Sequence, residues 1–256
     1  MSPALPHGLP PGRILSGPMP VWVSDEFPDD VGQLWSRLRY GQASSGLVPL
    51  LVRPDVIGSP LGLDRVDSVC LHEVLPAAFA AYRRARLPFW TAPRTVPTPD
   101  DVEPWPHDPG PPYAKWPGFA PAVQSESPAT APASQAAALL DEVTGPEPAY
   151  RLALVRARRA ADALAALGWT ADAPLALLCA LLRSWEERFG AQLVAVSGSE
   201  VHLAVARPPV SAEHARLLAV EHVLTTAHNI VDDPPTPFPE YAERLVGRTH
   251  WSFWWD

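Results

Sequence analysis

The sequence predicts an α+β protein in which helices pack on a small mixed sheet. Three observations support this class: short apolar runs typical of strands, longer runs with apolar residues at helical spacing, and a glycine turn between two of the strand candidates. Residues 147–256 are expected to form the main domain, with the element order β-α-α-β-β-α-α-β. A smaller N-terminal α/β unit (residues 1–86) and a proline-rich strap and linker (residues 87–146) are expected to precede it.

The N-terminal unit contains two strand candidates and two helix candidates. Apolar runs at residues 21–23 and 47–52 predict short strands. Between them, Asp29 and Asp30 supply an N-cap and a first-turn acid for a helix that Gly41 ends. A second helix is expected over residues 75–86, and its last turn carries three basic residues that suit the helix dipole: Arg83, Arg84 and Arg86.

Residues 87–132 form a proline-rich zone without helical or strand periodicity, in a chain that has 33 prolines against 15 glycines. Aromatic residues stand among these prolines, which a plain flexible linker would not need: Trp105, Tyr113, Trp116 and Phe119. Two interpretations stay open. The segment is either a ligand for a proline-recognition module or an ordered strap packed on its own domain, and the large aromatic area favours the strap. Residues 125–134 form a linker, and residues 135–143 a short helix.

The first half of the main domain alternates between strand and helix. A strand is expected at residues 150–155, followed by a helix at residues 159–167 that Gly168 closes. Asp172 with Pro174 opens the next helix, whose apolar stripe ends at Gly190.

The second half begins with a β-hairpin and ends with a strand. Residues 193–196 and 200–206 flank the turn Ser197-Gly198-Ser199. Ser211 caps a helix that reaches about residue 226, a short helix follows at 240–246, and residues 250–256 alternate like a terminal strand. Because this set of capped elements is complete, we expect residues 147–256 to fold without the rest of the chain.

Several runs in this region carry a family resemblance. They are Arg158-Arg-Ala-Ala-Asp-Ala-Leu-Ala-Ala-Leu-Gly-Trp169, Trp185-Glu-Glu-Arg-Phe-Gly-Ala-Gln-Leu-Val194 and the ending Trp251-Ser-Phe-Trp-Trp-Asp256. Together they resemble the bacterial family called domain of unknown function 4253, over about residues 147–256. The stretch Trp116-Pro-Gly-Phe-Ala-Pro121 is similar to the segment before that domain in family members. The resemblance implies a domain boundary and assigns no activity.

Composition excludes several classes of protein. The formal net charge is −8, whereas a protein that follows a nucleic-acid backbone needs a basic face, so no nucleic-acid partner is expected. The longest apolar run, residues 173–182, is far short of the roughly 20 residues of a membrane span, and the first residues do not look like a signal peptide. We therefore expect a cytoplasmic protein without a membrane partner. Two cysteines, Cys70 and Cys179, form no disulfide framework.

Standard catalytic and metal motifs are absent from the sequence. It has no phosphate-binding glycine loop, no Cys-x-x-Cys and no Gly-x-Ser-x-Gly elbow. His214 and His222 stand on one predicted helix, but their spacing of eight residues puts them about 12 Å apart along the axis. One metal ion cannot be held by both, because zinc–nitrogen bonds are only about 2 Å long. No metal and no cofactor is therefore predicted.

Three arginines, Arg156, Arg158 and Arg159, stand at the start of a predicted helix, where the dipole disfavours cations. One interpretation is an anion site, in which guanidinium groups and the first free backbone N–H groups bind a carboxylate or phosphate. The other is pairing with some of the chain's 28 acidic residues. In the terminal strand, Trp254 points to the face opposite Trp251, Phe253 and Trp255, and is either covered by a helix or exposed for a partner.

Two function classes remain. A binding or interaction module for an unknown protein or an anionic ligand fits the missing catalytic motifs and the arginine cluster, and is the leading hypothesis. The alternative is an enzyme of unrecognised type that acts on an anionic small molecule, with His222, His228 and Asn229 near the arginines. The candidate anion- or partner-binding residues are Arg156, Arg158, Arg159, His222, Asn229 and Trp254.

Overall fold

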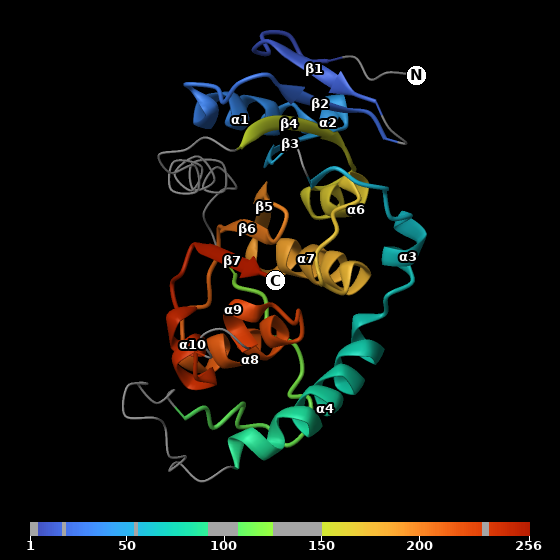
Figure 1. Ribbon diagram of the computed structural model, residues 1–256. Helices are drawn as coiled ribbons and strands as arrows, with labels where there is room; N and C mark the ends of the chain where they lie inside the picture. Colours follow the sequence, from blue (N-terminus) through green and yellow to red (C-terminus); the bar gives the residue numbers. More distant parts are fainter. Residues whose placement is uncertain (1–4, 17–18, 54–55, 92–106, 125–149, 232–235) are drawn as a thin grey trace, which may run out of the picture.

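The computed structural model describes residues 5–16, 19–53, 56–91, 107–124, 150–231 and 236–256 (Figure 1). Its strands form one mixed sheet of seven strands in the order β1-β2-β4-β3-β5-β6-β7, and the α+β class is confirmed. The strands are β1 (Gly12–Leu15), β2 (Val21–Ser24), β3 (Leu47–Val52), β4 (Arg151–Arg156), β5 (Ala191–Val196), β6 (Glu200–Val205) and β7 (His250–Trp254).

The helices lie close to the positions that caps and spacing predict. They are α1 (Val31–Tyr40), α2 (Gln42–Ser45), α3 (Leu63–Asp67), α4 (Leu71–Trp90), η2 (Ala160–Asp162), α6 (Ala163–Leu167), α7 (Leu175–Phe189), α8 (Ala212–Val223), α9 (His228–Val231) and α10 (Phe238–Arg244). Ser211 caps α8 by accepting a hydrogen bond from the His214 N–H at 3.2 Å. The expected helix at residues 135–143 lies outside the described residues. None of the described helices is long and apolar enough to cross a membrane.

Helix α4 is longer than predicted. It runs to Trp90, so that the arginines near residue 85 lie a turn before its end. The extension is stabilised by Trp90, whose ring is buried and lies in edge contact with Tyr82, with 5.6 Å between the ring centroids. Elements β1, α2, α3 and α9 were not predicted, because each is only four or five residues long.

Strand β4 lies between β2 and β3, and pairs antiparallel with both. Strand β3 in turn pairs in parallel with β5. The sheet therefore interleaves strands from residues 1–86 with strands from residues 147–256, where the sequence suggested a smaller N-terminal α/β unit that precedes the main domain. The physical reason is that every side chain of β3 is buried, so β3 requires neighbours on both edges and cover on both faces. The boundaries 1–86, 87–146 and 147–256 remain a prediction.

Side chains that alternate along the strands are buried on both faces of the sheet. Leu47, Leu51 and Leu152 belong to a cluster with Trp35 and Leu38 of α1, while their neighbours Val48 and Leu50 belong to a second cluster with α6, α7 and α8. The larger cluster contains most of the tryptophans near the C-terminus. Helices of the predicted main domain thus cover one face, and α1 covers part of the other.

Residues 107–124 pack on the rest of the chain. Trp116 lies in edge contact with Phe79 of α4 (6.2 Å) and with Phe119 (5.7 Å). His214 of α8 donates from Nε2 to the Pro121 carbonyl at 2.7 Å. These contacts are those expected of an ordered strap; Trp105 lies outside the described residues.

A buried ion pair anchors this strap. Glu221 of α8 is fully buried and accepts hydrogen bonds from the Ala120 N–H (2.9 Å), Trp185 Nε1 (2.9 Å) and Arg188 Nη1 (2.8 Å). Arg188 also donates to the Ala120 carbonyl at 2.7 Å. One carboxylate therefore ties the strap to α7 and α8.

Replacing Glu221→Gln should lower the free energy of unfolding by about 3–5 kcal/mol, because removal of one partner leaves the other charge buried and uncompensated. Urea denaturation measures the change. Glu187→Gln is the matched control: its carboxylate is 67% exposed and pairs with Arg159 at the surface, so the loss should stay below about 1 kcal/mol. Equal losses in the two variants would contradict a structural role for the Glu221 charge.

Candidate functional site

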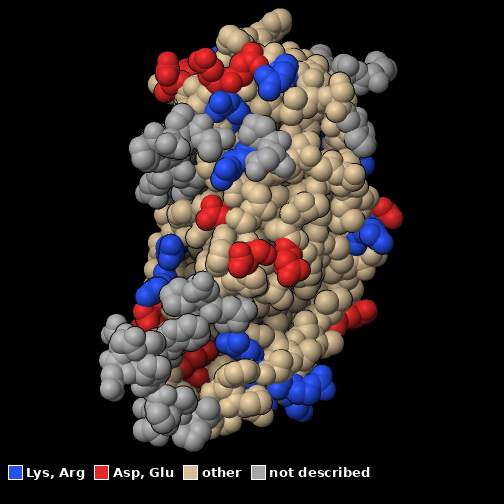
Figure 2. Space-filling view, in the orientation of Figure 1, with Lys and Arg blue, Asp and Glu red and all other residues tan. Residues whose placement is uncertain are grey.

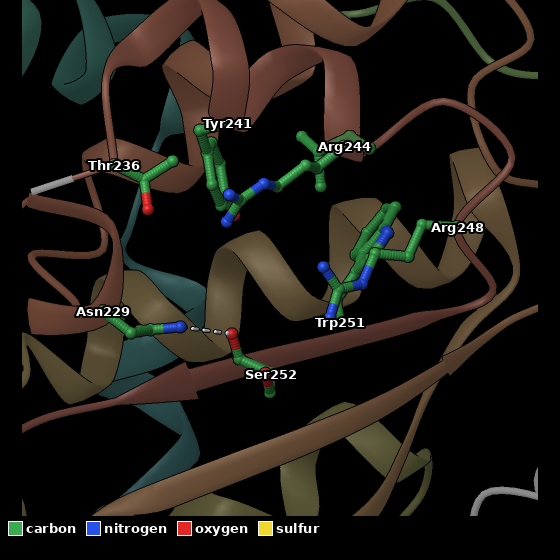
Figure 3. Close-up of a pocket in the computed structure, with 8 residues that line it drawn as sticks. Asn229, Thr236, Tyr241, Arg244, Arg248, Trp251 and Ser252 are labelled. Atoms are coloured by element: carbon green, nitrogen blue, oxygen red, sulfur yellow. Dashed lines mark hydrogen bonds between the residues drawn. The ribbon is translucent and has the colours of Figure 1, made fainter. Parts of the chain in front are cut away.

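A pocket of about 190 Å³ lies between α9, α10 and β7 (Figure 3). We call it the α10–β7 pocket. It is lined by Asn229, Thr236, Tyr241, Arg244, Leu245, Arg248, Trp251 and Ser252. In Figure 3, Tyr241 and Arg244 enter it from α10, while Asn229 and Ser252 lie along β7.

Helix α10 places the two polar side chains through its short amphipathic pattern. Phe238 and Ala242 are buried and fix one face of the helix. Tyr241 and Arg244 are three residues apart and therefore lie on one side of it, toward the pocket. Gly247 then adopts a left-handed conformation (φ 69°) and turns the chain toward β7, which brings Arg248 to the pocket wall.

Asn229 binds the outer edge of β7. Its Nδ2 donates to the Ser252 carbonyl at 3.1 Å, and its Oδ1 accepts from the Trp254 N–H at 2.9 Å. The side-chain amide thus takes the place of a neighbouring strand, and satisfies backbone groups that an edge strand would leave unpaired. Asn229 holds one wall of the pocket against the sheet.

His222 and Tyr241 form a hydrogen-bonded pair beside the pocket, with 2.8 Å between His222 Nδ1 and the Tyr241 hydroxyl. Three aromatic rings enclose His222 in edge contacts: Trp185 (4.7 Å), Trp251 (4.7 Å) and Phe253 (5.0 Å). Burial, with a further contribution from Arg188, holds the pKa of His222 well below its usual value. Burial also raises the pKa of Tyr241, and Arg248 opposes that effect. Both groups are therefore neutral at pH 7.

The pocket carries two guanidinium groups. Arg244 pairs with Glu240 one turn earlier on α10, and both side chains are about half exposed. Arg248 donates from Nε to the His250 carbonyl at 2.8 Å. No carboxylate is among the described residues that line the pocket. Since exposed ion pairs are weak, the Glu240 contact leaves Arg244 available to another anion.

Acidic side chains gather elsewhere, at the end of the molecule formed by β1, β2 and α1, as Figure 2 shows. Asp25, Glu26, Asp29 and Asp30 lie there, in the connection between β2 and α1. In this chain of net charge −8, the described lining of the α10–β7 pocket thus carries two guanidinium groups and no carboxylate, and one of the two, Arg244, pairs with Glu240.

The sequence-predicted residues fall into two groups in the structure. His222, Asn229 and Trp254 come together around β7, with Asn229 bonded to the Trp254 backbone. Trp254 is half-buried, and its ring contacts His228, with 5.8 Å between the ring centroids. The arginines beside Asn229 are Arg244 and Arg248, rather than the cluster that the sequence suggested.

The predicted arginine cluster lies at the end of β4, beside acidic residues. Arg159 binds Glu186 at 2.9 Å and Glu187 at 3.0 Å, as the salt-bridge interpretation expects. Arg156 and Arg158 are exposed. Anion binding at these three arginines remains a prediction.

Tyr241, Arg244 and Arg248 are the pocket residues that sequence reasoning missed. The only local signal for Tyr241 and Arg244 is their spacing of three residues on a short helix, which is typical of many surface helices, and Arg248 lies after the helix without such a signal. Among the described residues, no group of three or more His, Cys, Asp or Glu side chains could hold a metal ion.

Comparison with known proteins finds a family model that matches this part of the chain. Residues 151–256 match the model of a family described as a domain of unknown function, DUF4253, which confirms the resemblance over that range. Every described residue of the α10–β7 pocket lies within the match. Neither a curated protein nor a solved structure matches the chain.

Proposed function

We propose that this chain, whose residues 151–256 match the DUF4253 family, is a binding module for a small anion held in the α10–β7 pocket. The observation that carries the proposal is the pair of guanidinium groups, Arg244 and Arg248, in a pocket whose described lining holds no carboxylate. Guanidinium groups bind carboxylates and phosphates through charge-assisted hydrogen bonds.

The size of the pocket limits the ligand. Pockets for drug-sized molecules measure about 300–1,000 Å³, whereas this pocket measures about 190 Å³. It therefore suits a free oxyanion, or the acidic group of a larger molecule whose remainder stays outside.

The neutral His222–Tyr241 pair is better suited to ligand binding than to catalysis. A general base works best when its pKa lies near the working pH, and burial moves the pKa of His222 far below that range. The pair can still donate and accept hydrogen bonds. This favours the binding module over the alternative, an enzyme that acts on an anionic small molecule.

Replacing Arg244→Gln or Arg248→Gln should weaken the binding of inorganic phosphate about 10- to 100-fold, since a hydrogen bond to a charged group contributes about 1.5–3 kcal/mol. Titration calorimetry in low-salt buffer measures the affinity. A rise in melting temperature with phosphate concentration gives an independent readout in the parent protein.

The double variant Arg156→Gln/Arg158→Gln is the matched control, because it removes two exposed arginines outside the pocket. It should bind phosphate like the parent. The reverse pattern, with binding lost in this control and kept in the pocket variants, would move the anion site to the end of β4. Absence of any phosphate binding by the parent would refute the proposal.

A further inference from the structure

We infer that the α10–β7 pocket selects an oxyanion that keeps a proton at neutral pH, as phosphate does, over one that has none, as sulfate does. The inference rests on the proposed function, and names the class of anion. It follows from the way His222 orients the Tyr241 hydroxyl.

The proton of neutral His222 belongs on Nε2. This atom is buried without a hydrogen-bond partner among the described residues, and the imidazole is enclosed by three aromatic rings in edge contact. A phenol O–H is a stronger hydrogen-bond donor than the N–H of a neutral imidazole, and an imidazole nitrogen is a stronger acceptor than a phenolic oxygen, so the pair is favoured with Tyr241 as the donor. Nδ1 is therefore the acceptor of the pair.

Tyr241 must then donate its single proton to His222 Nδ1 across the 2.8 Å contact. The lone pairs of the phenolic oxygen are left to accept hydrogen bonds. Tyr241 lines the pocket together with Arg244 and Arg248, and in Figure 3 its hydroxyl end lies toward the guanidinium group of Arg244, where the oxygen can act as an acceptor. Burial raises the pKa of Tyr241, so that the hydroxyl keeps its proton at neutral pH.

An acceptor in an anion site discriminates between oxyanions. Phosphate carries at least one O–H group at neutral pH and can donate it to the Tyr241 oxygen. Sulfate has only acceptor oxygens, and one of them would face a lone pair. Sites built to bond a ligand O–H reject analogues that lack it, and here we expect at least about a 10-fold preference, equal to one hydrogen bond of roughly 1.4 kcal/mol.

Titration calorimetry with inorganic phosphate and with sulfate, at pH 7 and matched ionic strength, tests the inference. The parent should bind phosphate at least about 10-fold more tightly than sulfate, which is the difference expected for one hydrogen bond. In Tyr241→Phe the acceptor is gone, so phosphate affinity should fall to that of sulfate, while sulfate affinity is kept or improved. Equal affinities in the parent, or a preference that survives in Tyr241→Phe, would overturn the inference.

The comparison in the parent needs no variant, so a Tyr241→Phe protein that fails to fold still leaves the inference open to refutation. Equal, arginine-dependent binding of both anions would refute the inference and leave the proposed function standing. Binding of neither anion would refute both.

Phenyl phosphate distinguishes free phosphate from the phosphoryl group of a larger molecule. It is used at pH 6, where a phosphate ester keeps its second proton on part of the molecules. Tighter binding than inorganic phosphate identifies the phosphoryl group of a larger molecule as the ligand, and weaker binding identifies free phosphate.

Discussion

Deletion of residues 251–256 should abolish cooperative folding. The segment carries Trp251, Phe253 and Trp255, which are at most 2% exposed. Phe253 stacks on Trp185 of α7 at 5.5 Å, and Trp255 lies in edge contact with Trp169 at 5.3 Å. Each buried aromatic lost costs about 3–5 kcal/mol, so that the three together, at about 9–15 kcal/mol, are comparable to the roughly 5–15 kcal/mol by which native proteins are stable.

Near-ultraviolet circular dichroism and a thermal melt of the truncated chain measure this loss. We expect no fixed aromatic signal and no cooperative transition. Trp254→Ala is the control within the same strand, because Trp254 is half-buried on the opposite face, and its loss should cost about 1 kcal/mol. A truncated chain that melts cooperatively near the melting temperature of the parent would show that residues 251–256 are not needed for the core and act at the surface.

Local sequence patterns predicted many of the helices and strands. Strand β3 was predicted at its observed bounds because its apolar run is short, although the run includes Pro49. Helix α7 ends at Gly190, which adopts the left-handed conformation that glycine favours after a helix. The C-terminal strand was predicted from its alternation, and β7 buries Trp251 and Phe253 on one face as expected.

The strand order could not be predicted in the same way. Strand β4 pairs with β3, roughly 100 residues earlier in the chain, and nothing local to either strand specifies that partner. The partners of Arg159 could not be predicted locally either, although they are nearer in the chain. Its acidic neighbours Glu186 and Glu187 lie 27 and 28 residues away, on α7.

Only part of the candidate site could be predicted from the sequence, for a similar reason. His222 and Asn229 stood out as residue types with functional chemistry, but their roles depend on partners from other elements. Tyr241, Arg244 and Arg248 gather only when α10 packs against α8 and the chain returns as β7. A basic residue at the end of a short helix is common, so the sequence of α10 alone does not indicate a pocket.

Residues 147–256 should not fold alone, contrary to the expectation that their complete set of elements raised. In the full chain, β4 pairs with β2 on one edge and with β3 on the other. The isolated segment lacks both partners, so the backbone N–H and C=O groups of β4 would lose their ladders. Leu152 and Leu154 would also lose their contacts with the α1 cluster, and β5 would become an unpaired edge.

Expression of residues 150–256 alone should therefore give a protein without a cooperative thermal transition, while co-expression with residues 1–124 should restore one, because the second piece supplies β2 and β3. The two pieces should also co-purify, since the β3–β4 pairing runs through six residue pairs from Leu47–Arg156 to Val52–Arg151. A fragment of residues 150–256 that melts cooperatively by itself, near the temperature of the full chain, would show that β4 is dispensable. It would also show that the sheet from β5 to β7, with the helices that cover it, is a domain in its own right.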